Sequence, residues 1–174
     1  MNIHHLFDLN EQSSRELYFQ MKNKYGYSFN DDERLKFENL VLDHFKSLNI
    51  DFDSVIYAQT DNHILKSILS KLNKNQYEMK KNSATDIKLI VDCMKMSKPE
   101  KQKLMTSLSS NDIVKIASLA GNQRRRIQPH LFKSEQVNVG TKVLFFDDSM
   151  FSGSTLNAVK QQYPIHEVFV IFKK

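Results

Sequence analysis

The sequence predicts an α/β protein in which a mainly parallel sheet is flanked by helices, within a single domain spanning residues 1–174. Short apolar runs at 54–58, 143–146 and 167–172 have the length of buried strands, and helical patterns separate them along the chain. No Pro/Gly-rich linker and no internal repeat divides the chain, and its length is typical of about one domain.

The first 50 residues are expected to form a helical N-terminal part. One predicted helix covers residues 11–24 and ends near Gly26. Asn30 is a candidate N-cap for a second helix, because three acidic residues follow it in the first turn. Apolar residues at helical spacing then predict a core-facing stripe, made of Phe37, Leu40, Val41, Phe45 and Leu48.

A polar loop at 59–63 joins the predicted strand at 54–58 to a predicted helix at 64–72. Ligands of parallel α/β sheets bind at the carboxyl ends of strands, so this loop is expected to face the end of the 143–146 strand. The candidate contacts are Gln59, Thr60 and Asp61. His63 fits a polar helix-start residue better than a catalytic group.

Residues 85–120 are predicted to be helical throughout, as a helical insertion or hood. Ser97-Lys98-Pro99-Glu100 has the capping-box arrangement with proline in the first turn. Asn111 is a candidate cap for a further short helix that closes at Gly121. The apolar residues Met94, Met96, Leu104 and Met105 are interpreted as packing surface.

The segment Val143–Thr155, VLFFDDSMFSGST, is the most informative part of the chain. A predicted strand is followed by two adjacent carboxylates, a small hydroxylated loop around Gly153 and a helical stretch at 156–162. Loop amides and a helix N-terminus favour an anionic phosphate, and carboxylates accept hydrogen bonds from sugar hydroxyls. The pattern predicts a sugar-phosphate site, and the alternative is a polar turn that binds no ligand.

This segment resembles the phosphoribosyl-pyrophosphate (PRPP) motif of type I phosphoribosyltransferases. The matched positions are the acidic pair, a two-residue spacer and the phosphate loop: Asp147 and Asp148, Ser149 and Met150, and Ser152, Gly153, Ser154 and Thr155. The resemblance implies a type I phosphoribosyltransferase-like fold, an acidic pair that holds the ribose 2′- and 3′-hydroxyls, and a loop that holds the 5′-phosphate. It also implies that the 59–61 loop contacts pyrophosphate and that Mg²⁺ is held mainly by PRPP oxygens near the acidic pair, with no direct protein ligand.

Two aromatic residues depart from the family pattern. Phe145 is bulkier than the usual aliphatic strand residue. Phe151 stands where the family has Thr, Ser, Ala or Asp, and phenylalanine cannot handle a proton on the base as that Asp does in purine-base enzymes. A non-purine acceptor is therefore expected. Only Lys173 and Lys174 follow the last predicted strand, so a base pocket is expected from other helices or from a partner subunit.

The segment Gly121–Val139 loosely resembles the region before the PRPP motif in the competence-associated branch of the family. That resemblance implies a mobile basic loop that closes over pyrophosphate, with Arg124 and Arg125 as candidate contacts. Arginine keeps its charge and offers forked donors to phosphate oxygens. A solvated triplet is equally favoured, and contact with the phosphates of DNA or RNA is a third interpretation.

The formal net charge of +5 is unevenly distributed. Residues 1–50 hold six basic and eight acidic side chains, whereas residues 98–133 hold eight basic and two acidic ones. With Cys93 as the single cysteine, no internal disulfide can form. No apolar run reaches the length of a membrane span and the N-terminus lacks a secretory pattern, so a cytoplasmic location is expected.

Three functions follow from these observations. The first is Mg²⁺-dependent transfer of phosphoribosyl from PRPP to an unidentified acceptor with release of pyrophosphate, for which the catalytic candidates are Asp147, Asp148, Arg124 and Arg125. The second is a non-catalytic regulatory protein that binds PRPP or a ribose-5-phosphate nucleotide. The third is a nucleic-acid-binding module that uses residues 98–133. The sequence leaves a homodimer open and predicts no membrane partner.

Overall fold

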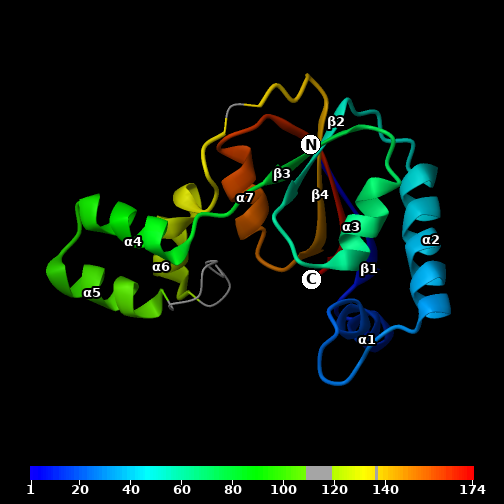
Figure 1. The fold of residues 1–174 in the computed structure, drawn as a ribbon, viewed down its shortest axis with the longest axis horizontal. Helices are drawn as coiled ribbons and strands as arrows, with labels where there is room; N and C mark the ends of the chain where they lie inside the picture. Colours follow the sequence, from blue (N-terminus) through cyan, green and yellow to red (C-terminus); the bar gives the residue numbers. More distant parts are fainter. Residues whose placement is uncertain (109–118, 136) are drawn as a thin grey trace. The chain divides into compact units, whose positions relative to one another are not determined.

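The computed structural model describes residues 1–108, 119–135 and 137–174, and it confirms the predicted α/β class. Five parallel strands form one sheet in the order β1-β5-β4-β2-β3 (Figure 1). The strands are β1 (Asn2–Asp8), β2 (Ser54–Ala58), β3 (Asn75–Met79), β4 (Val143–Met150) and β5 (Ile165–Lys173). Parallel strands end at a common edge, so the carboxyl ends of the strands define the side of the sheet where ligands are expected.

The chain forms two compact units. The first unit contains 1–78, 138–152 and 164–174, and the second contains 79–137 and 153–163. The helices of the first unit are α1 (Gln12–Met21), α2 (Asp31–Ser47) and α3 (His63–Ser70). Those of the second are α4 (Ala84–Cys93), α5 (Lys98–Ser107), α6 (Gly121–Ile127), the 3₁₀ turn η2 (Gln128–His130) and α7 (Ser154–Lys160).

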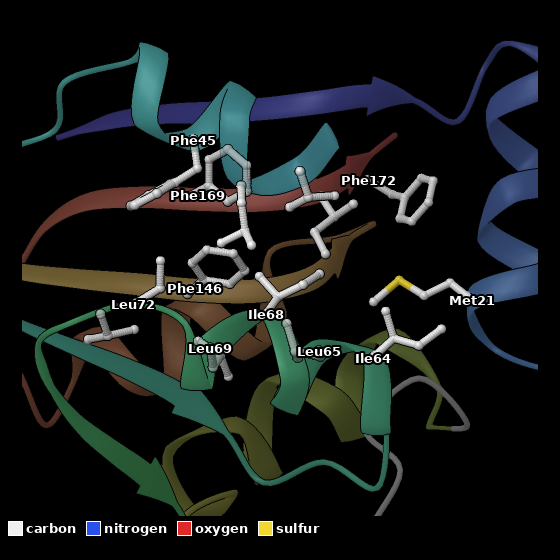
Figure 2. Packing of buried hydrophobic residues seen from close by; sticks show 14 of the residues in the cluster. Met21, Phe45, Ile64, Leu65, Ile68, Leu69, Leu72, Phe146, Phe169 and Phe172 are labelled. Atoms are coloured by element: carbon white, nitrogen blue, oxygen red, sulfur yellow. The ribbon is translucent and has the colours of Figure 1, made fainter. Parts of the chain in front are cut away.

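The core of the first unit lies between one face of the sheet and helices α2 and α3. Figure 2 shows Ile64, Leu65 and Ile68 of α3 directed at the sheet, where Phe146 and Phe169 lie. These five side chains are each no more than 2% exposed. Full burial of each such side chain contributes about 1.5–3 kcal/mol, which is why the apolar runs of the sequence locate the central strands correctly.

The second helix begins as predicted. The Asn30 side chain accepts a hydrogen bond from the Glu33 N–H at 2.9 Å, and the Glu33 carboxylate accepts one from the Asn30 N–H at 3.0 Å. The predicted apolar stripe is confirmed at Phe37, Val41 and Phe45, which are buried. Leu40 is instead 50% exposed, because the stripe is narrower than the sequence spacing indicated.

The two strands at the edges of the sheet were not predicted. β1 reads NIHHLFD and β3 reads NQYEM, and neither is an apolar run. Each has a single neighbouring strand and keeps polar residues at its surface, so burial imposes little pattern on its sequence. The N-terminal part is consequently a strand followed by helices, rather than helical throughout.

The predicted helical stretch at 85–120 is interrupted. Met94 adopts an extended backbone conformation between α4 and α5, and the Glu100 carboxylate at the start of α5 accepts a hydrogen bond from the Ser97 hydroxyl at 2.9 Å. The methionines at 94, 96 and 105 pack on the core of the second unit, as interpreted. Gly121 begins α6 instead of ending a helix, and Asn111 lies outside the described residues.

Candidate functional site at the carboxyl edge of strand β4

Strand β4 is longer than predicted and includes the acidic pair. Asp147 pairs with Val170 of β5 and Ser149 pairs with Phe172. The Lys174 N–H then donates to the Met150 carbonyl at 3.1 Å. Pairing with the long strand β5 therefore holds Asp147–Met150 in extended conformation, where the sequence indicated the start of a loop.

The two carboxylates of the motif leave opposite faces of the sheet, because side chains alternate along a strand. Leu144 and Phe146 belong to the core covered by α2 and α3, and Asp148 follows in the same alternation. Asp147 is half-buried on the other side, and its Oδ1 accepts a hydrogen bond from the Asp148 N–H at 2.8 Å. The two carboxylates therefore have different surroundings.

Asp148 forms a buried ion pair with Lys22, the residue that caps the C-terminus of α1. The side chains are 8% and 22% exposed respectively, and the Ser149 hydroxyl donates to Asp148 Oδ1 at 2.7 Å. Burial lowers the pKa of Lys22, but the charge of Asp148 and its hydrogen bond outweigh burial, so the pKa of Lys22 is raised overall. Lys22 is thus held as a cation beside the motif.

Sequence reasoning missed Lys22. It lies 126 positions from Asp148 along the chain, and a lone lysine at the end of a helix has no pattern that indicates a buried partner. Only the packing of α1 against the end of the sheet brings the two charges together. A weaker signal was available. Asp148 follows the buried residues Leu144 and Phe146 at alternate positions of the strand, and a buried carboxylate requires a partner.

Tyr18 of α1 extends the same network. Burial raises the pKa of Tyr18. The charge of Lys22 opposes this rise, whereas the charge of Asp148 adds to it. The Ser149 side chain hydrogen-bonds Tyr18, and the Tyr18 ring meets Phe151 edge-on with 5.7 Å between centroids. Helix α1 therefore supplies a phenol and an ammonium group to the carboxyl end of β4.

The loop after β2 lies beside this strand end, as predicted. β2 and β4 are neighbours with Ser54 opposite Val143 and Ile56 opposite Phe145. The Thr60 hydroxyl accepts from the Asn62 N–H at 3.1 Å. Asn62 itself caps α3 by accepting from two backbone N–H groups at 3.0 and 3.2 Å.

These contacts define roles for the predicted residues of the loop. Thr60 shapes its turn, Asp61 is exposed, and Gln59 is half-buried with a partner of its own. His63 is the first residue of α3 and is exposed, which confirms its interpretation as a helix-start residue.

The predicted phosphate loop contains the boundary between the two units, which falls between Ser152 and Gly153. Gly153 has φ +67° and precedes α7, a left-handed conformation that glycine adopts without a steric penalty. Ser152 is exposed, Ser154 is buried and Thr155 is half-buried. Gly153 is thus the residue that immediately precedes the first turn of α7.

Residues Gly121–Ile127, which contain the arginine triplet, form helix α6 in the second unit, so the loop that the resemblance implied is wrong at these residues. One guanidinium nitrogen of Arg124 donates to the Leu119 carbonyl at 3.2 Å, and Arg126 pairs with Glu100 at 3.3 Å. Arg125 is exposed. Gln123 and Ile127 are buried and anchor the helix. Their separation of four residues is typical of one helix face and was the available sequence signal for a helix here. Contact of these arginines with pyrophosphate or nucleic acid stays a prediction.

Two kinds of feature are absent from the described residues. No three His, Cys, Asp or Glu side chains in ranges 1–108, 119–135 and 137–174 gather as a metal site. Within the same ranges, no helix has both the length and the apolar character of a membrane span.

Comparison with known proteins gives no relative: no family model, curated protein or solved structure matches the chain. The resemblance to phosphoribosyltransferases therefore rests on the residues of the motif, and membership of that family stays a prediction.

Proposed function

We propose that the chain binds PRPP, or a ribose-5-phosphate nucleotide, through the segment Asp147–Thr155 and transfers the phosphoribosyl group to a non-purine nitrogen nucleophile. The observation that carries this proposal is the position of the motif. Its carboxylates lie at the carboxyl end of β4, a central strand of a parallel sheet. This is the edge at which sheets of this class bind their ligands.

The proposed roles follow from the different surroundings of the two carboxylates. Asp147 accepts hydrogen bonds from the ribose hydroxyls. Asp148 is neutralised by Lys22 and acts as a positioning residue that fixes Ser149 and the end of β4. Hydroxyl and amide groups of the phosphate loop bind the 5′-phosphate, and these come from Ser152, Gly153, Ser154 and Thr155.

The proposed reaction needs no protein nucleophile. The bond between the anomeric carbon and pyrophosphate oxygen breaks with its electron pair, the acceptor nitrogen forms the new C–N bond, and its proton passes to solvent. Positioning and charge neutralisation then supply the rate enhancement. Mg²⁺ is proposed to bind through PRPP oxygens and to neutralise the leaving pyrophosphate. The described residues form no protein-built metal cluster, and no residue is assigned as a direct ligand.

A regulatory protein that binds the same ligand without turnover is the second candidate. It is supported by the Lys22–Asp148 pair, which occupies one of the two carboxylates that the motif would offer to ribose. The exposed Phe151 supports it too, since this side chain has no proton to give or take.

Pyrophosphate release from PRPP with Mg²⁺, measured against a panel of purine, pyrimidine and amine acceptors, separates the candidates. We expect release with a non-purine acceptor, and a loss of about 100-fold for Asp147→Asn. Asp53→Asn, at the opposite end of the sheet, is the matched control and should retain the rate. PRPP binding without release from any acceptor would favour the regulatory protein, and absence of PRPP binding would refute both.

A further inference from the structure

Five aromatic side chains form a continuous group from α1 to the end of β4, within the first unit. They are Tyr18, Phe19, Tyr25, Tyr27 and Phe151, and we call them the aromatic surface. The ring centroids of Tyr18 and Phe151 are 5.7 Å apart, and those of Tyr18 and Phe19 are 5.8 Å apart. Phe19 then meets Tyr25 at 5.1 Å and Tyr27 at 6.1 Å. Helix α1 and the loop after it appear in blue in Figure 1.

The outer members of this group are unusually open to solvent for aromatic residues. Tyr25 is 80% exposed, Phe151 is 54% exposed and Tyr27 is 42% exposed. Such rings add little to the core, and a contiguous exposed aromatic group is typical of a binding surface.

The loop that carries Tyr25 is held in an uncommon backbone conformation. Asn23, Tyr25 and Gly26 have φ values of 50°, 56° and 79°. A bulky residue such as tyrosine seldom adopts positive φ, because its Cβ then approaches the backbone. Strain of this kind in a loop is commonly found at functional sites, and here it accompanies the most exposed ring of the group.

The aromatic surface is joined directly to the predicted sugar-phosphate motif. Phe151 lies within the motif, between the carboxylates and the phosphate loop, and four residues of chain from Asp147 span at most about 14 Å. Tyr18 contacts the Phe151 ring and hydrogen-bonds Ser149, the neighbour of Asp148. Two ring pairs meet at 72° and 84°, the edge-to-face geometry that aromatic side chains favour.

We infer that the aromatic surface stacks against a nucleobase and forms the base-recognition part of the proposed sugar-phosphate site, an inference that rests on the proposed function. Every base has a flat π-face, and stacking on an aromatic side chain contributes about 1–3 kcal/mol per base. Phe151 accordingly recognises the base by its ring instead of by proton transfer. The ligand class is a mononucleotide, or a free base held beside the phosphoribosyl group.

Charge favours a mononucleotide over a nucleic-acid strand at this surface. The first 50 residues, which contain four of the five rings, hold eight acidic and six basic side chains. Lys22, a basic residue beside the motif carboxylates, is already paired with Asp148. A strand with many phosphates would find no excess of positive charge in this part of the chain to neutralise its backbone.

Isothermal titration of the full chain with uridine, uridine 5′-monophosphate, adenosine 5′-monophosphate and ribose 5-phosphate tests the inference. We expect at least one nucleotide to bind roughly fivefold or more tightly than ribose 5-phosphate, the minimum that one stacked base supplies. Tyr25→Ala should remove this advantage while ribose 5-phosphate binds unchanged. Phe151→Ala should remove the advantage too, and Phe151→Tyr should preserve it. Both truncated residues are exposed, so circular dichroism should show folded variants. Leu35→Ala, an exposed apolar position on α2, is the matched control.

The outcomes separate this inference from the proposed function. Binding of ribose 5-phosphate that needs Asp147, with no gain from a base, would overturn the inference and leave the proposed function standing. Uridine binding that needs Phe151, without any binding of ribose 5-phosphate, would support the surface and refute the sugar-phosphate site. Tighter, Phe151-dependent binding of a single-stranded oligonucleotide than of either mononucleotide would overturn the assigned ligand class. Absence of binding by all four probes would overturn both.

Discussion

A carboxylate lies near each end of strand β4. One of them is bound by backbone N–H groups and a hydroxyl, and the other is paired with an ammonium group. Before the strand begins, Asp53 accepts hydrogen bonds from the Thr141 N–H at 3.0 Å, the Thr141 hydroxyl at 3.1 Å and the Lys142 N–H at 2.9 Å. Asp53 is exposed to solvent. At the other end, Asp148 is buried against the Lys22 ammonium group.

This difference separates a folding role from a binding role. Asp53 fixes the turn that leads into β4 by using backbone donors, and an exposed carboxylate loses little hydration when it does so. Asp148 and Lys22 must both be desolvated, and a buried pair of this kind adds little net stability compared with apolar side chains. We therefore infer that the charged end of β4 serves ligand binding, whereas the Asp53 end serves folding.

Removal of the lysine should have the largest effect on stability. Lys22→Met leaves the Asp148 carboxylate buried without its counter-charge, and we expect the free energy of unfolding in urea to fall by about 3 kcal/mol. Lys24→Met, two residues further on at an exposed position, is the matched control and should change it by less than about 0.5 kcal/mol. Addition of Asp148→Asn to Lys22→Met should restore part of the loss. Equal stabilities for the two single variants would show that the ion pair is not formed.

The turn at the Asp53 end should show an intermediate effect. Gly140 has φ +77°, and a Cβ at this residue would lie 3.1 Å from the Asp53 Cβ. Gly140→Ala should therefore lower the free energy of unfolding by about 1–2 kcal/mol. Gly121→Ala is its control, because a Cβ there meets no atom within 4 Å and φ is not positive. If both alanine variants unfold at the same denaturant concentration, the close packing of the turn against Asp53 is contradicted.

A smaller effect is expected at alkaline pH. Folding raises the pKa of Lys22. The protonated lysine therefore contributes its full stabilisation of the folded state below the unfolded pKa of about 10.4. This contribution is lost as pH rises through the higher pKa of the folded state. The raised pKa of Tyr18 acts in the same direction. The free energy of unfolding in urea should fall as pH rises from about 9 to about 11, a range around the unfolded pKa. The fall should be shallower for Lys22→Met than for Lys24→Met, and identical slopes would argue against a perturbed lysine.

The smallest effect on stability is expected at acidic pH, and it concerns Asp53 near the opposite end of the strand. Backbone hydrogen bonds from Lys142 and Thr141 lower the pKa of Asp53, assisted by the Thr141 hydroxyl. The stabilisation from Asp53 is therefore present above its unfolded pKa of about 3.9 and is lost as pH falls through the lower, folded value. Asp53→Asn should reduce the acid dependence of unfolding below about pH 4. A wild-type acid dependence in this variant would contradict the role of the turn.

The sequence predicted the parts of this molecule that burial governs. The apolar runs located β2, β4 and β5, and the Asn30 pattern located the start of α2, because burial and capping leave local signals. The edge strands β1 and β3 escaped prediction, because a strand with one neighbour needs no apolar run. The capping box at Ser97–Glu100 located the start of α5, but the end of α4 escaped, since no proline or glycine marks Met94.

The candidate site was predicted in composition but not in geometry. The residue types of Asp147–Thr155 indicated a sugar-phosphate motif, and the structure places its carboxylates at the expected edge of the sheet. The extension of β4 through Asp148 depends on pairing with β5, and the Lys22 partner comes from a helix far away in sequence. The opposite orientation of the carboxylates follows only once β4 is known to extend through them, and the contact of Phe151 with Tyr18 has no local signal.

The central claim is that the carboxyl end of β4 binds the ligand. Titration of the full chain with PRPP in the presence of Mg²⁺ tests this claim most directly, because it compares the PRPP affinities of variants at the two ends of the strand. We expect saturable binding by the wild-type chain, weakened at least about tenfold by Asp147→Asn, which corresponds to the loss of hydrogen bonds to a charged acceptor. Asp53→Asn should bind with the wild-type affinity. No binding by the wild-type chain, or equal affinities for Asp147→Asn and Asp53→Asn, would contradict the assignment of the carboxyl end of β4 as the ligand site.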